Sequence, residues 1–108
     1  MDTNHPENAS SQEVADGVRI TQLVAGSKMS VIYYQIDPGS ELPEHSHHHE
    51  QSGYVLQGEA EFIVDGNSHE FSEGDTYLIP GDEPHRILNT GNDTLEGIDI
   101  FSPPRENW

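Results

Sequence analysis

Between residues 18 and 101 the chain is divided into short apolar segments by closely spaced turn signals. The segments are rich in β-branched and aromatic residues, and none shows a convincing helical period. The turns include Asp37-Pro38-Gly39-Ser40, in which Pro presets φ and Gly supplies a positive φ, and Asp65-Gly66, a strong hairpin signal. Such a pattern predicts an all-β fold, a small barrel or sandwich with little or no helix. The predicted strands are residues 18–25, 30–36, 52–57, 59–64, 67–71, 76–79, 85–88 and 95–101.

A length of 108 residues fits one domain. Residues 1–16 are rich in Asn, Ser, Glu and Pro, so we predict a disordered or loosely docked N-terminal tail, followed by a β-barrel domain at residues 17–108. The first 12 residues are polar, unlike a signal peptide, and no stretch is long enough to span a bilayer. We therefore expect a soluble, cytoplasmic protein without a membrane partner.

The charge balance is strongly acidic, with 20 Asp and Glu residues against 4 Lys and Arg residues and a net charge of -16. Because so few basic residues could neutralise phosphates, nucleic acid is not an expected partner. The acidic excess and the single lysine favour adaptation to high salt, as in a halophile, over an ordinary acidic protein. The absence of cysteine excludes disulfides and thiolate metal sites.

Residues 39–58 contain four of the seven histidines and have a glycine at each end. His45 and His47 are two residues apart, so in an extended strand both imidazoles can project into one cavity. Gln51 follows four residues later, about where the chain would return along the next strand. Two imidazoles and a third donor form part of a transition-metal site. We expect the second half of the chain to supply a further ligand.

Two stretches between residues 39 and 89 resemble the two sequence motifs of the cupin family. The first motif is matched by Gly39, His45, His47, Gln51 and Gly58. The second is matched by Gly74, Pro80, His85 and Asn89, with Asp82 where the family usually has glycine. The resemblance implies a single-domain, jelly-roll-like cupin barrel. It also implies a metal held by His45, His47, Gln51 and His85.

The resemblance implies one divalent transition metal, and the ligand set does not distinguish Ni, Zn, Fe, Mn, Co and Cu. Many cupins have glutamate at the position of Gln51. A neutral amide leaves the full charge of the metal uncompensated, which should weaken binding and strengthen Lewis acidity. We expect His48 and His49 to be solvated or to lie behind the ligands. Strand alternation should point Glu50 away from the site.

The segment at residues 99–108 carries a third signal. Asp99 and Phe101 are two residues apart and share a strand face, which would look into the barrel if it points inward. Arg105 follows Pro103-Pro104, whose extended path could place the guanidinium at the barrel mouth, where it would suit a substrate carboxylate. The alternative is an exposed Asp99 and an Arg105 that pairs with a surface acid.

This segment and the histidine stretch together resemble the KdgF-type cupins of pectin degradation, which linearise 4,5-unsaturated uronates to 4-deoxy-5-keto acids. The resemblance places the catalytic aspartate on Asp99, as general acid/base, with a metal Lewis acid. It places the packing aromatic on Phe101 and the substrate-contacting arginine on Arg105. It implies a sugar acid as substrate and a homodimer. The alternatives are a cupin dioxygenase or other small-molecule metalloenzyme, and a non-enzymatic metal- or sugar-binding cupin.

Overall fold

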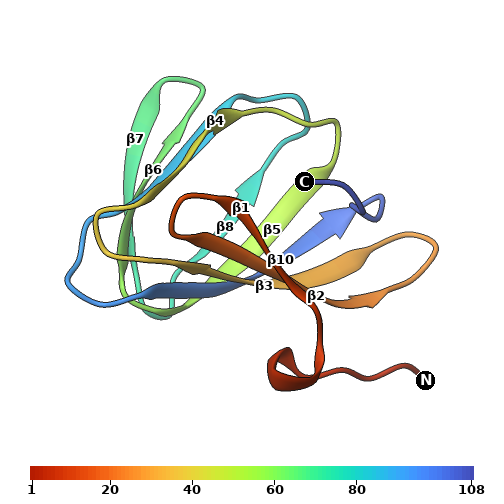
Figure 1. Ribbon diagram of the computed structural model, residues 1–108. Coiled ribbons are helices and arrows are strands. Elements are labelled where there is room, and N and C mark those ends of the chain that lie inside the picture. Colours follow the sequence, from red (N-terminus) through yellow and green to blue (C-terminus); the bar gives the residue numbers. More distant parts are fainter.

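Ten antiparallel strands form two sheets that face each other across one core in the computed structural model, which describes residues 1–108 (Figure 1). One sheet has the order β1-β2-β3-β10-β5-β8 and the other the order β4-β9-β6-β7. The elements are η1 (Pro6–Asn8), β1 (Ser11–Ala15), β2 (Val18–Ala25), β3 (Ser30–Ile36), β4 (Glu41–His45), β5 (Glu50–Gln57), β6 (Glu59–Val64), β7 (Asn67–Ser72), β8 (Thr76–Ile79), β9 (His85–Asn89) and β10 (Leu95–Ser102). The predicted all-β fold is confirmed.

Local turn chemistry explains where the strands reverse. Asp65 and Gly66 both have positive φ, 49° and 80°, as the predicted tight hairpin between β6 and β7 requires. Gly39 has φ 78°, in agreement with the turn expected after β3. The only helical element, η1, is three residues long, so no helix here could cross a membrane.

Two strands were not predicted from the sequence. β4 contains Pro43, which lacks a backbone donor, and its register with β9 shifts between Leu42 and His45. Such a strand is tolerated because β4 lies at the edge of its sheet. β1 pairs with β2 and takes in residues 11–15 of the predicted tail, of which Val14 and Ala15 pack against the core. The tail boundary at residue 16 stays a prediction.

The core lies between the two sheets and is built by alternate residues of the strands. In β3, for example, Ile32, Tyr34 and Ile36 are buried while the residues between them are partly exposed. The buried hydrophobic residues are Val18, Ile20, Ile32, Tyr34, Ile36, Val55, Ala60, Phe62, Tyr77, Ile79, Ile87, Leu95 and Phe101. At one end of this core the apolar side chains give way to the buried polar residues Gln51, His85 and Asp99.

Candidate functional site

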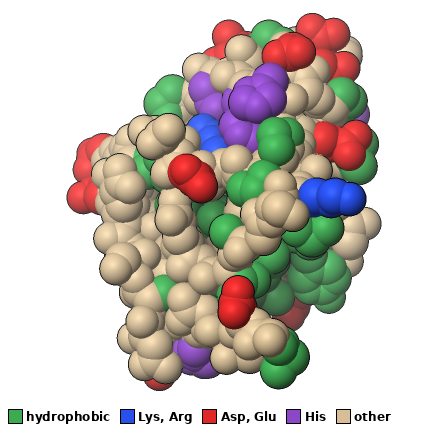
Figure 2. Space-filling view, turned by 90° about the vertical axis from the view of Figure 1, so that its right-hand side faces the viewer, with side chains coloured by type: hydrophobic (Ala, Val, Ile, Leu, Met, Phe, Trp, Pro, Cys, Tyr) green, Lys and Arg blue, Asp and Glu red, His purple; other side chains and the backbone are tan.

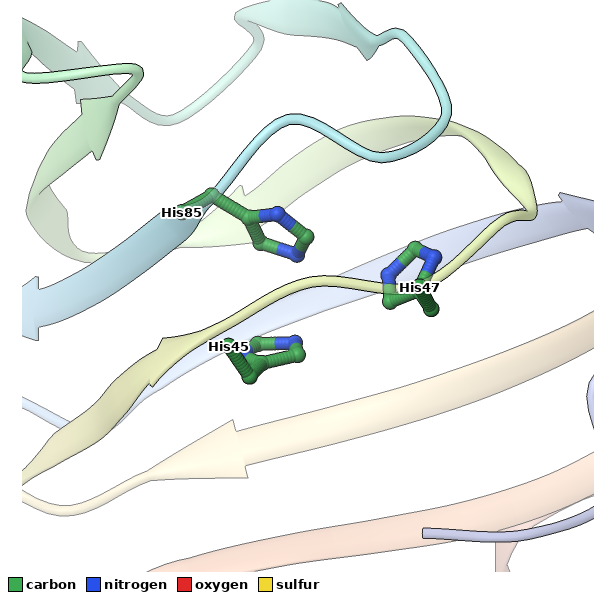
Figure 3. A group of neighbouring side chains, drawn as sticks. All are labelled: His45, His47 and His85. Atoms are coloured by element: carbon green, nitrogen blue, oxygen red, sulfur yellow. The ribbon is translucent and has the colours of Figure 1, made fainter.

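Three histidines from different parts of the chain converge at one end of the core (Figure 3). His45 ends β4, His47 lies in the loop to β5, and His85 begins β9. His45 and His85 are brought together because they are register partners in the β4–β9 pair. One ring nitrogen of each histidine lies within 4.8 Å of the others. The predicted convergence of these three residues is therefore present.

Backbone carbonyl groups fix the tautomer of all three imidazoles. Each Nδ1 contacts a carbonyl oxygen two residues away; the acceptors belong to Pro43, His49 and Glu83, at 2.9, 3.1 and 2.9 Å. A carbonyl oxygen can only accept, so each Nδ1 carries a hydrogen and each Nε2 of a neutral ring presents a lone pair. This arrangement prepares a histidine to bind a metal through Nε2.

The surroundings keep these imidazoles neutral. Desolvation by burial is the main cause that lowers the pKa values of His45, His47 and His85. It lowers the pKa of His47 to about 4, with the positive charge of Arg105 as the next cause. Neutral rings have their lone pairs free for a cation near pH 7.

Gln51 adds an oxygen to this cluster from β5. Its side chain is 3 % exposed, and its Oε1 lies 3.1 Å from Nε2 of His47 while its Nε2 donates to Oδ2 of Asp99 at 2.9 Å. Oε1 therefore faces a nitrogen that presents a lone pair. Nε2 of His85 is buried without any hydrogen-bond partner. Acceptor atoms converge here without a donor, so the residues fit a metal cation.

Asp99 lies on β10, next to this cluster, and is 4 % exposed. Its Oδ1 accepts a hydrogen bond from the hydroxyl of Tyr77 and its Oδ2 accepts the one from Gln51. Burial raises the pKa of Asp99 to about 7, although the two hydrogen bonds and the charge of Arg105 oppose the rise. A carboxyl group with a pKa near neutrality can both accept and release a proton.

Arg105 is held over the site by the C-terminal segment. Its backbone N–H donates to Oγ of Ser30 at 3.0 Å, and its guanidinium carbon lies 4.0 Å from the ring centroid of Trp108 and 5.3 Å from that of Phe101. The two ion pairs of the structure join other residues, Arg19–Asp37 and Arg86–Glu41. The alternative of an exposed Asp99 and an ion-paired Arg105 is therefore wrong.

Two cavities adjoin His45, and Arg105 and Trp108 also line both of them. The inner one, of about 20 Å³, is also lined by Gln51 and Asp99. The outer one, of about 220 Å³, has mainly apolar walls from β1, β2 and β4. Figure 2 shows histidine side chains gathered at one place on the surface, with a basic side chain beside them. The inner cavity has room for little more than one water molecule, and Arg105 and Trp108 are among the residues that line it.

The other residues close to the proposed metal ligands in the sequence take different positions. His48 is exposed, His49 is half-buried beside the ring of Phe101, and Glu50 is exposed, as strand alternation predicts. Asp82 has φ 67°, a conformation that favours glycine, which accounts for the usual glycine at this position of the motif. Its N–H donates to the carbonyl of His47 at 2.7 Å and so ties the two ligand-bearing loops together.

Sequence reasoning missed three residues of the site, Tyr34, Tyr77 and Trp108. In the sequence, both tyrosines have the pattern of apolar strand residues. No neighbouring residue predicts the hydrogen bonds that their hydroxyls form. Trp108 is separated from the strands by a polar stretch. Its only signal is that it is the single tryptophan of the chain.

The chain is similar to known proteins in sequence and in fold. The pectin degradation protein KdgF of Dickeya dadantii is 24% identical over 98 residues, which cover 90% of this chain and 88% of that protein. The solved structure of KdgF from Halomonas sp. matches with a TM-score of 0.87 and 27% identity, covering 98% of this chain and 96% of that one. The uncharacterized protein MJ1618 of Methanocaldococcus jannaschii is 34% identical over 80 residues, which are 73% of this chain but only 64% of that protein.

The Cupin domain family matches residues 32–101, which include all four predicted metal ligands together with Asp99 and Phe101. This match covers well over half of the chain, and the two facing antiparallel sheets agree with it. The chain therefore belongs to the cupin family.

Proposed function

We propose that this protein binds one divalent transition metal and opens the ring of a 4,5-unsaturated uronate to give a 4-deoxy-5-keto acid. The observation that carries the proposal is the convergence of three imidazole lone pairs and the Gln51 oxygen beside a buried carboxyl group and a guanidinium that forms no ion pair. The similarity to two proteins named KdgF, one of them a pectin degradation protein, supports it.

His45, His47, His85 and Gln51 would hold the metal. When bound, the metal would supply a positive charge that stabilises negative charge developing on a substrate oxygen. The proposed ligands are neutral, so they contribute no charge that would offset this effect. The metal could be Ni, Zn, Fe, Mn, Co or Cu, since imidazole and amide donors do not select among them.

The substrate class fits the other residues. The guanidinium of Arg105 would bind the substrate carboxylate, and Phe101 would pack against the sugar ring. Asp99 would take the proton of the anomeric hydroxyl and deliver a proton to C4. The bond between the anomeric carbon and the ring oxygen breaks, carbonyl groups form at C1 and C5, and the net reaction is an isomerisation that needs no oxidant.

The test is to follow the ultraviolet absorbance of the conjugated uronate with metal-loaded protein. Because the net charge of -16 repels an anionic sugar, the assay is best run near 1 M salt, where the Debye length is about 3 Å. We expect loss of absorbance that stops when a chelator removes the metal. Loss no faster than in buffer, with protein that contains metal, would overturn the proposal.

The narrow inner cavity favours a second candidate, a non-enzymatic metal-binding protein. At about 20 Å³ it cannot admit a sugar ring, so turnover at Asp99 requires some of its lining side chains to move. Tight metal binding without loss of any uronate would support this candidate. A dioxygenase would consume oxygen instead, and it would ordinarily have a carboxylate where this chain has Gln51.

Replacing Arg105 by lysine should raise KM for the uronate by about 10- to 100-fold and change kcat less. Lysine keeps the charge but loses the planar fork that suits a carboxylate, and it loses the stacking on Trp108. Steady-state kinetics at fixed salt measure the effect. Arg19→Lys, at an ion pair with Asp37, is the matched control and should leave KM unchanged. Equal KM values for both variants would contradict the assignment.

The expected homodimer has a candidate interface on the outer face of β10, β5 and β8. Four of the six large exposed hydrophobic residues lie there, namely Tyr54, Leu56, Leu78 and Ile100. Two copies that each carry a charge of -16 repel one another, so an apolar face is the part of the surface best suited to contact a second copy. We expect a dimer that Leu78→Glu converts to monomer in sedimentation velocity, while Met29→Glu does not. A monomeric wild type would contradict this.

A further inference from the structure

A chain of buried hydrogen bonds runs from the middle of the core to the histidine cluster. The hydroxyls of Tyr34 and Tyr77 are 3.0 Å apart, Tyr77 donates to Oδ1 of Asp99, and Nε2 of Gln51 donates to Oδ2 at 2.9 Å. Oε1 of Gln51 then lies 3.1 Å from Nε2 of His47. The four residues from Tyr34 to Gln51 come from β3, β8, β10 and β5, and none is more than 8 % exposed.

While Asp99 is ionised, the hydrogen bonds in this chain have a single direction. A phenol has one hydrogen, so if Tyr77 donates to Asp99 its oxygen must accept from Tyr34. Both carboxylate oxygens of Asp99 then act as acceptors, and Gln51 must turn its NH₂ group toward them. The carbonyl oxygen of the same amide is therefore forced toward His47. The orientation of Gln51 follows from its partners on the core side.

Two glycines leave room for this chain of hydrogen bonds. A Cβ atom at Gly53 would lie 2.3 Å from Oδ1 of Asp99 and from the hydroxyl of Tyr77. A Cβ atom at Gly97 would lie 2.3 Å from the hydroxyl of Tyr34. Both contacts are far shorter than van der Waals distance, so any larger residue would displace the tyrosines or the carboxylate. The two glycines thus leave room for the rings and the hydroxyls of both tyrosines.

We propose that Tyr77, supported by Tyr34, acts through Asp99 as a positioning residue that aims the carbonyl oxygen of Gln51 at the metal. The inference rests on the proposed metal binding and adds a reason for the amide at position 51. A glutamate there would bring a second carboxyl group against Asp99, and because two adjacent carboxylates repel each other, one of them would have to take up a proton. Gln51 and Asp99 are therefore a matched pair, one donating and one accepting.

The first test uses Tyr77→Phe, with Tyr54→Phe on the exposed outer face as the matched control. Both proteins are titrated with Co²⁺ under competition by a chelator, and the absorption spectrum of the bound ion is recorded. We expect Tyr77→Phe to bind Co²⁺ about 10- to 100-fold more weakly and to shift the spectrum, because lost support behind a ligand has effects of this size. Wild-type affinity and spectrum in folded Tyr77→Phe would overturn the proposal.

The second test exchanges the amide and the carboxyl group between positions 51 and 99. It gives a result even if Tyr77→Phe fails to fold. Gln51→Glu alone should lower the melting temperature of the metal-free protein, because two carboxyl groups then meet in the core and one of them must take up a proton to avoid repulsion. Adding Asp99→Asn restores one donor and one acceptor, so the double variant should melt above Gln51→Glu. It should also bind Co²⁺ more tightly than wild type, since a carboxylate now faces the ion. Strictly additive effects of the two substitutions would overturn the pairing.

These readouts separate the inference from the proposed function because none uses a substrate. Wild-type protein that binds Co²⁺ with the expected variant effects but leaves the uronate intact would refute the ring-opening activity alone. Turnover of the uronate together with an unaffected Tyr77→Phe would refute the positioning role alone. Failure of the wild type to bind Co²⁺ would overturn both.

Discussion

Replacing Asp99 by asparagine is expected to lower kcat for uronate ring opening by about 10²- to 10⁴-fold, the range that proton transfer by a positioned side chain contributes. The substitution is nearly isosteric, so the cavity and Phe101 should keep their positions. The asparagine oxygen can still accept the hydrogen bond from Gln51, while its NH₂ group can donate to Tyr77 after the tyrosine hydroxyls reverse direction. The loss should therefore arise from the missing proton carrier rather than from a missing metal.

The measurement pairs kinetics with metal analysis. Metal content and Co²⁺ affinity of Asp99→Asn should stay within about 10-fold of wild type. This is the lower end of the loss in metal affinity expected when a residue that hydrogen-bonds to a ligand is changed. A control at Asp93, an exposed acid in the turn before β10, tests whether any lost negative charge has the same effect. Asp99→Asn with wild-type kcat would show that another group moves the proton.

Replacing His85 by alanine is expected to weaken metal binding by more than about 100-fold. Losing a residue that only supports a ligand already weakens metal binding by about 10- to 100-fold, and His85 is itself a proposed ligand. His85 is 1 % exposed and its Nε2 has no partner within the protein, so its role in the cluster cannot be taken over by a neighbour. Activity on the uronate should fall in parallel. The metal-free variant should melt at a lower temperature than metal-free wild type, because the substitution leaves a cavity and removes the hydrogen bond from Nδ1 to the Glu83 carbonyl, so each protein is compared with its own metal-free form.

The direct measurement is the rise in melting temperature on adding metal. At a metal concentration of 100 times Kd, binding stabilises the folded state by about 2.7 kcal/mol, and this rise should disappear in His85→Ala. His69→Ala removes an exposed histidine on β7 and should keep the full rise. If His85→Ala retains it as well, the three histidines do not form the site.

The sequence is informative where a signal is local. The period-2 pattern and the β-branched segments predict most of the strands, and Asp65-Gly66 predicts its hairpin, because each depends on a few adjacent residues. β4 could not be predicted in this way. Pro43 breaks the local pattern, and the strand exists because β9 offers it an edge to pair with. Location in the cytoplasm and adaptation to high salt stay predictions.

In the candidate site, too, some features follow from local sequence signals and others depend on contacts between distant segments. The spacing of His45, His47 and His85 within the motifs predicts their convergence, since each motif fixes where its own histidine leaves a strand. The amino-acid sequence alone determined the all-β architecture and the residues that could hold a metal. Only the tertiary structure decided that Tyr77 donates a hydrogen bond to Asp99 and that Trp108 lines the cavity beside it. These contacts join distant segments, and they depend on how the strands of the folded barrel pair and face one another, which no local pattern encodes.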